Sequence, residues 1–400
     1  MLILPPPLSL FSLPCSSVHH SLFICSKYLL QGIPSGIPLP SFMRNKPHMK
    51  KVLNVVMGMA VCCALHAQTA NVEKIADESL DVAVGGTFGK SKIIPRLDKL
   101  AIAQASIYFK NITTREVVEH ERGALGRRKT DGGSVAGRIT AYLQITDGEL
   151  TEADYQELAD GFYSYLSAQL NAAGVSTVDW NTIAATDFHR EEGKDLDDVK
   201  KDLDAMKKKG QVYTAVNANK GNVLFKYNID GGINPGFAFG KIKKANRFSE
   251  TVGAPVVFMH LTVDFADIWL DGDVRTGTKE TRTSFYTKIT KTKKWKMDSE
   301  VGADMKVTPA GLSMFWNEKA QTENLVVKQD IHSGEAFASA VSEDAEKEKL
   351  RAKDNIFAKD FNLTPVVIST TKAQYKAAAK KALEVYADAF VAKVKMSRKS

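Results

Sequence analysis

All four cysteines of this 400-residue chain lie near its amino terminus, and none follows Cys63. Residues 68–400 must therefore fold without disulfide bonds. A segment of this length can bury a hydrophobic core that is stable without covalent cross-links. The same absence excludes a cysteine nucleophile, a thiolate zinc site and an iron–sulfur cluster from this part of the chain.

The amino-terminal part has a composition of its own, because eight of the 13 prolines precede Met49 and the first acidic residue is Glu73. From Met49, two lysines are followed by an apolar run over residues 52–65 and by the small residue Ala67. This order and length are typical of a secretory signal peptide. We therefore expect translation to begin at Met49, so that residues 1–48 are a mis-called upstream leader, with a long, proline-broken leader as the alternative. We expect residues 49–67 to be a cleaved signal peptide and the chain to be exported to the periplasm or outer envelope.

The amino-terminal part supplies +5 of the net charge of +8 of the chain. Residues 68–400 contain 49 basic and 46 acidic residues, which leaves a net charge of +3. A nearly neutral chain lacks the basic character expected of a nucleic-acid-binding protein. We expect no nucleic-acid partner and no integral membrane span after residue 67, and an envelope protein or a glycan as the partner.

Helical periodicity is clearest over residues 152–173, where apolar residues recur at three- and four-residue steps. Thr151 and Asp154 provide a capping pattern at its start, and Gly174 ends it. Similar patterns predict helices over residues 195–209, 335–353 and 372–395.

Strand patterns occupy residues 100–111, 175–180, a hairpin over residues 211–228, and most of residues 255–331. A change in the apolar face predicts a bulge near Ala266 or Asp267, and Asp271-Gly272 predicts a turn. Gly-rich and basic stretches over residues 115–138 and 230–247 are expected to be loops. A further strand is expected over residues 363–369.

This order of elements predicts an α+β fold, with a largely antiparallel sheet flanked by about four helices. We expect a polar lead-in over residues 68–100 and a single compact domain over residues 101–396. A division into two lobes within residues 230–247 is the alternative.

Three segments carry a resemblance to known families. They are residues 101–109, the helix over residues 158–174 with its Leu170-Asn171-Ala172-Ala173-Gly174 ending, and residues 382–394. Together they resemble the periplasmic α/β domain of curli-transport lipoproteins and the TolB N-terminal domain. The resemblance implies an envelope binding or assembly role, and it carries over no catalytic residue.

Ionisable residues are densest in one predicted strand and the turn after it. The weak catalytic candidates there are His260, Asp264, Asp267 and Asp271, with Asp273 beside them. In a strand, His260 and Asp264 share a face opposite the apolar one, which predicts a solvent-facing pair. General acid–base catalysis needs such groups with tuned pKa values in a cleft.

Two expected loops contain candidate binding residues for an anionic ligand or a sugar: Arg127, Arg128 and Lys129 in the first, and Phe237, Phe239 and Lys243 in the second. A solvated loop is the simpler interpretation of both. Residues 85–91 resemble a phosphate-binding loop, but Val84 stands where its first glycine is required. No histidines are at metal-ligand spacing, so we expect neither a cofactor nor a metal.

These patterns favour an exported binding or assembly protein of the cell envelope without catalytic activity. The alternative is a hydrolase that acts on an envelope polymer with the carboxylates between Asp264 and Asp273.

Overall fold

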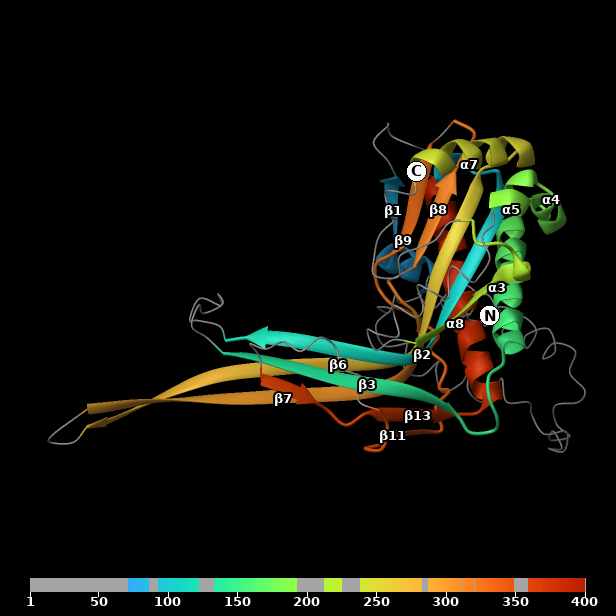
Figure 1. Cartoon of the computed structure of the whole chain (residues 1–400). Helices are drawn as coiled ribbons and strands as arrows, with labels where there is room; N and C mark the ends of the chain where they lie inside the picture. The colour runs from blue at the N-terminus through green and yellow to red at the C-terminus, as the bar shows by residue number, and fades with distance from the viewer. Residues whose placement is uncertain are drawn as a thin grey trace, which may run out of the picture. The chain divides into compact units, whose positions relative to one another are not determined.

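The computed structural model describes residues 71–85, 93–121, 133–192, 212–224, 238–282, 287–309, 311–319, 321–348 and 359–399 (Figure 1). The chain divides into two units, Met1–Ala67 and Gln68–Ser400, and every described residue belongs to the second. Among these residues, no helix is both long enough and apolar enough to cross a membrane.

The second unit is built on a 13-stranded sheet, in which most neighbouring strands are antiparallel. The main order is β1 (Leu80–Gly85), β9 (Thr322–Val327), β8 (Leu312–Trp316), β6 (Val256–Arg282), β2 (Lys99–His120), β3 (Ser134–Ile145), β13 (Val366–Thr370) and β11 (Ala340–Glu343). The remaining strands are β4 (Ser176–Thr177), β5 (Val212–Asn217), β7 (Thr287–Val307), β10 (Ile331–His332) and β12 (Lys359–Asn362). The expected mixture of helices with a largely antiparallel sheet is confirmed.

Two very long strands, β2 and β6, change partners along their length. β2 begins parallel to β6 and ends antiparallel to β3, while β6 begins between β2 and β8 and then continues with β7. Beyond the point where β2 and β6 separate, the sheet therefore continues as a β2–β3 ribbon and a β6–β7 ribbon. Both ribbons run past the helices in Figure 1.

The main core lies between the sheet and two long helices, α3 (Glu152–Ala172) and α8 (Lys372–Lys399), which pack against each other. The predicted stripes of both helices are buried, including Phe162, Leu166, Tyr386 and Phe390. Burial of these apolar side chains is the main source of stability for amphipathic helices. The two longest expected helices are therefore confirmed.

A second hydrophobic cluster lies on other residues of the same strands. It joins Val256 and Phe258 of β6 to Phe248 of α7 (Ala238–Val252) and to Ile183 of α4 (Trp180–Ala184). A short helix, α5 (Asp187–Glu192), follows α4. Successive residues of a strand point to opposite faces, so β6 is covered on both faces here.

The amino terminus of α3 is held by a reciprocal capping box. The Thr151 Oγ1 accepts a hydrogen bond from the Asp154 backbone N–H at 3.3 Å, and the Asp154 carboxylate accepts one from the Thr151 N–H at 2.8 Å. Lys372 of α8 also binds this carboxylate, at 3.0 Å. These contacts hold the pKa of Asp154 well below its usual value, and the largest contribution is the Thr151 backbone hydrogen bond.

We expect Thr151→Ala to lower the free energy of unfolding by about 1 kcal/mol, because the first turn of α3 loses its side-chain acceptor. Urea unfolding of the full chain measures this change. Thr151→Ser keeps the hydroxyl and serves as the matched control. Equal losses in the two variants would show that the lost methyl group, and not the cap, is responsible.

Two expectations about the sheet are wrong: the loop over residues 115–138 and the turn at Asp271-Gly272. Residues 115–120 and 134–138 belong to β2 and β3 and not to a loop, and β6 continues through Asp271-Gly272 without a turn. At Gly272, a Cβ atom would lie 3.1 Å from Val135 and 3.2 Å from Met297. This glycine permits a close approach between the two ribbons and does not mark a turn.

Two further expectations fail because contacts with distant parts of the chain outweigh local sequence preference. Residues 340–343 pair with β13 as an edge strand, so the helix expected over residues 335–353 does not form there. Residues 238–247 belong to α7 and not to a loop. The helix expected over residues 195–209 lies outside the described residues.

Other expectations hold in part. The bulge is confirmed, since the β6–β7 register shifts between Asp264 and Ala266. The strand over residues 175–180 is reduced to β4, because Trp180 begins α4. β5 pairs with β2, and Val223 forms only an isolated bridge where the second strand of the hairpin was expected.

Candidate functional site

A polar cavity of about 460 Å³ lies where β2 and β6 separate. Its lining mixes cations, carboxylates and hydroxyl groups, which come from Lys110, Thr113, Thr114, Arg115, Glu116, Asp264, Ala266, Asp267, Ile268, Lys306, Thr308 and Asp330. The cavity therefore draws on both ribbons, on Thr308 just after β7 and on Asp330 just before β10.

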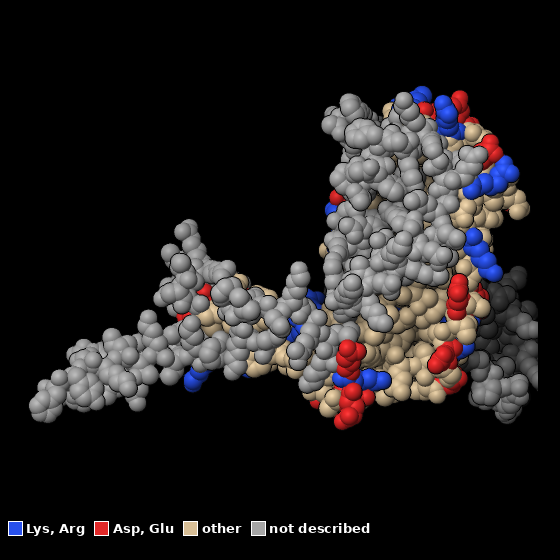
Figure 2. All heavy atoms as spheres, viewed as in Figure 1, with Lys and Arg blue, Asp and Glu red and all other residues tan. Residues whose placement is uncertain are grey.

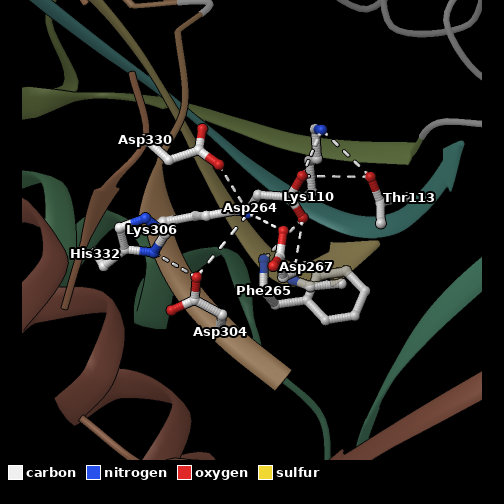
Figure 3. Close-up of polar contacts among 10 residues, drawn as sticks. Lys110, Thr113, Asp264, Phe265, Asp267, Asp304, Lys306, Asp330 and His332 are labelled. Atoms are coloured by element: carbon white, nitrogen blue, oxygen red, sulfur yellow. Dashed lines mark hydrogen bonds and ion pairs between the residues drawn. The ribbon is translucent and has the colours of Figure 1, made fainter. Parts of the chain in front are cut away.

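Asp264 is the central carboxylate of this cavity and is only 5% exposed. Its Oδ1 accepts hydrogen bonds from the backbone N–H groups of Phe265 and Ala266, at 2.9 and 3.3 Å. Its Oδ2 lies 2.6 Å from the Lys110 Nζ and accepts a 3.3 Å hydrogen bond from Thr113 (Figure 3). Asp264 thus satisfies the amides of the β-bulge and joins β6 to β2.

Lys306 forms the second charged centre, and its side chain is only 6% exposed. Its Nζ lies 2.8 Å from a carboxylate oxygen of Asp267 and 2.8 Å from one of Asp330. Asp304 is farther from this nitrogen, at 3.9 Å, and pairs with the His332 ring (Figure 3). Lys306 therefore ties β7 to β6 and to the residues before β10.

The pKa values of this centre follow its ion pairs. Burial alone would lower the pKa of Lys306, but its hydrogen bonds to Asp267 and Asp330 raise the pKa overall. The hydrogen bond from Lys306 is also the main reason why the pKa of Asp267 is lowered. Both pKa shifts show that the ion pair favours the charged forms of Lys306 and Asp267.

The lowered pKa of Asp267 predicts an acid-sensitive contribution to stability. A group with a depressed folded-state pKa stabilises the fold above its ordinary pKa of 3.8 and loses that contribution as the pH falls through the lower value. We expect the difference in unfolding free energy between the wild type and Asp267→Asn to be constant above about pH 5 and to shrink below pH 3.8. Urea unfolding at a series of pH values measures this difference.

The corresponding comparison at Asp298 of β7 is the control, because its partner Lys296 has a side chain that is 69% exposed, whereas that of Lys306 is 6% exposed. Exposed pairs of this kind contribute little to stability. A pH-independent difference for Asp267→Asn would contradict the ion pair with Lys306.

Of the catalytic candidates from the sequence, the structure brings Asp264 and Asp267 into one cavity. His260 and Asp271 do not line it. His260 is 3% exposed and lies 3.5 Å from the Gln104 side-chain nitrogen, and burial lowers its pKa to about 3. The expectation that His260 and Asp264 face solvent is wrong, because this face of β6 is covered. Asp271 is exposed and lies opposite Asp298 in the ladder.

The binding candidates cannot be placed in the same way. Arg127, Arg128, Lys129 and Phe237 lie outside the described residues. Phe239 and Lys243 belong to α7, but their side chains are outside the described part as well.

The site residues that the sequence pattern did not reveal are Lys110, Thr113, Lys306 and Asp330. Lys110 is 154 positions from Asp264, so no local spacing connects them. Lys306 gave no signal either, because a lysine between the apolar residues Met305 and Val307 of a strand is expected on the opposite, solvent-facing side.

Within the described ranges, no group of three or more His, Cys, Asp or Glu residues is arranged to hold a metal ion. What the geometry provides is a set of ion pairs that joins β2, β6, β7 and β10. No family model, no curated protein and no solved structure matches the chain. The resemblance to curli-transport lipoproteins and TolB therefore stays a prediction.

Proposed function

We propose that this chain is an exported binding or assembly protein of the cell envelope without catalytic activity. The observation that supports this proposal most directly is that Asp264 and Asp267, the two catalytic candidates that line the cavity, are both used in structural contacts. Asp264 accepts from two bulge amides, Lys110 and Thr113, and Asp267 pairs with Lys306. Such contacts hold strands in register and do not leave a carboxylate prepared for proton transfer.

The electrostatics support the same conclusion. A carboxylic acid that acts as a general acid near neutral pH needs a raised pKa, as burial without a cationic partner provides. The pKa of Asp267 is lowered by Lys306, which keeps this group ionised. A lysine-paired carboxylate with a lowered pKa is suited to holding strands or a ligand and not to donating a proton near neutral pH.

One observation favours the alternative, a hydrolase that acts on an envelope polymer. The cavity of about 460 Å³ brings Asp264 and Asp267 together with two lysines and several hydroxyl groups. A turnover screen of the full chain against glycan, peptide and ester substrates separates the two functions. Turnover that is lost in Asp267→Asn but retained in Asp298→Asn would overturn the non-catalytic proposal, and absence of turnover is the expected result.

Export is tested by intact-mass measurement on protein isolated from its natural compartment. We expect a chain that begins at Gln68, because Met49 to Ala67 has the order of a signal peptide. A chain that retains Cys62 and Cys63 would contradict the proposed cleavage. The same preparation, analysed for co-purifying glycan and protein, tests whether the chain carries an envelope ligand.

A further inference from the structure

Positive charge is concentrated in the far part of the β6–β7 ribbon, here called the distal ribbon: residues 274–282 of β6 and residues 287–296 of β7. It contains one acidic residue, Glu280, and eight basic residues, which are Arg275, Lys279, Arg282, Lys288, Lys291, Lys293, Lys294 and Lys296. Its net charge is therefore +7, whereas the rest of residues 68–400, with 41 basic and 45 acidic residues, carries −4. The positive charge is local and does not reflect a generally basic protein.

Positive charge is not concentrated in the rest of the ribbon or on the rest of the surface seen in Figure 2. Nearer the helices, the ribbon has seven acidic residues and one lysine over residues 264–273 and 297–306. On the face shown in Figure 2, the described Lys and Arg side chains are interspersed with Asp and Glu. A single-sign array of this density attracts ligands of opposite charge.

The strand register adds an independent observation. The ladder places Arg275 opposite Lys294, and it gives Lys279, Lys288, Lys291 and Lys293 threonines as partners. Like charges directly opposite each other destabilise an antiparallel pair. Asp273 opposite Lys296, at the boundary, is the one pairing of opposite charges in this part of the ladder. The register therefore places threonines or a like charge opposite most of these cations, and a bound anion would reduce the repulsion between Arg275 and Lys294.

The distribution of the cations over the two faces limits the kind of anion. Residues directly opposite each other share a face, so Arg275, Lys279, Lys288, Lys294 and Lys296 fall on one face of the ribbon. Arg282, Lys291 and Lys293 fall on the other face. A flat lipid surface would engage only one of these faces. A flexible linear polymer can follow both, and residues two apart on one face are spaced by roughly 7 Å, which suits repeated anionic groups.

We infer that the distal ribbon binds a linear acidic polysaccharide along its length. The choice of a polysaccharide over a nucleic acid rests on the proposed export of the chain, whereas the location of the site does not. Coulombic attraction between the ribbon and an anionic polymer is screened by salt, so binding weakens steeply as ionic strength rises.

The experiment measures binding of the full chain to polygalacturonate, with neutral dextran as the comparison polymer, at low and high salt. In the ribbon variant, Lys288, Lys291, Lys293 and Lys294 are all replaced by Gln. The control variant replaces Lys74, Lys319, Lys380 and Lys395 by Gln, which are exposed and lie outside the ribbon. Both variants lose four positive charges, so the overall change in charge is matched.

We expect salt-sensitive binding to polygalacturonate, no binding to dextran, and an affinity about 10- to 100-fold weaker in the ribbon variant, since each exposed ion pair contributes up to about a factor of five. The control variant is expected to retain wild-type affinity. Circular dichroism and thermal unfolding check that both variants fold, and the smaller Lys291→Gln, Lys293→Gln pair replaces the ribbon variant if it does not.

Several results would overturn the inference: equal losses in the two variants, no loss in either, or equal binding to dextran. Tighter binding to anionic lipid vesicles than to polygalacturonate would also overturn it. Tighter binding to DNA, lost in the ribbon variant, would overturn the polysaccharide assignment and count against export. Catalytic turnover, in contrast, would overturn the proposed function without changing any of these binding results.

Discussion

Replacement of Asp264 by alanine is expected to lower the free energy of unfolding by about 3–5 kcal/mol. Removal of this carboxylate leaves Lys110, whose side chain is 13% exposed, without its ion-pair partner. It also removes the acceptor of the Phe265 and Ala266 amides at the β-bulge. An uncompensated buried charge and unsatisfied buried amides are both costly, and here they arise together. Urea unfolding of the full chain measures the loss.

Asp267→Ala is the matched control, because it lines the same cavity but its side chain is 63% exposed. Its carboxylate is largely solvated, so its removal is expected to cost less than about 1 kcal/mol. Asp264→Asn, which keeps an acceptor for the bulge amides, is expected to fall between the two. If Asp264→Ala cost no more than Asp267→Ala, Asp264 would not be the structural joint between β6 and β2.

Phe390→Ala is expected to destabilise the protein by about 3–5 kcal/mol, the usual cost of deleting a fully buried aromatic side chain. Phe390 is 0% exposed on α8. Its ring stacks on Phe315 of β8 with centroids 5.9 Å apart and lies 6.2 Å from the Tyr386 ring. The truncation would therefore open a cavity between the helix and the sheet. Thermal or urea unfolding measures the change.

Two variants bracket this result. Phe390→Leu refills most of the volume and is expected to cost less than about 1.5 kcal/mol. Lys380→Ala changes an exposed position of the same helix and is expected to stay within about 0.5 kcal/mol of the wild type. A small loss in Phe390→Ala would mean that α8 is not packed on β8 as the structure shows.

Elements with a sustained period were predictable from the sequence. The apolar stripes of α3 and α8 repeat along helices of 21 and 28 residues, so single exceptions could not hide them. The bulge near Ala266 was predictable as well, because the apolar face of β6 changes parity there. In both cases, an element that buries one face needs apolar residues at regular spacing, and this spacing is visible in the sequence.

A glycine and an arginine suggested the wrong secondary structure, because each has its role in a contact with another strand. Gly272 reads as a turn residue, yet it makes room for Val135 and Met297 of neighbouring strands. Arg138 reads as a loop residue, yet it is 5% exposed and pairs with Glu116 at 3.0 Å. Neither contact has a signature in the local sequence, because each depends on a strand that arrives from a distant position.

The candidate site was predictable only in part, for the same reason. Asp264 and Asp267 share one strand, so their spacing on either side of the bulge was visible in the sequence. Their lysine partners, Lys110 and Lys306, come from β2 and β7, and only the strand register places them within hydrogen-bond distance. The burial of His260 likewise depends on the covering of a second face of β6.

By itself, the sequence determined that residues 68–400 fold without disulfides, that α3 and α8 are amphipathic, and that charge is segregated along residues 264–306. These properties depend on composition and on short-range periodicity, which the linear chain carries in full. The tertiary structure alone decided which charges are paired, which glycines separate strands and which face of β6 is covered. Those properties depend on pairing between strands, whose stabilising free energy comes from groups 22 to 154 residues apart.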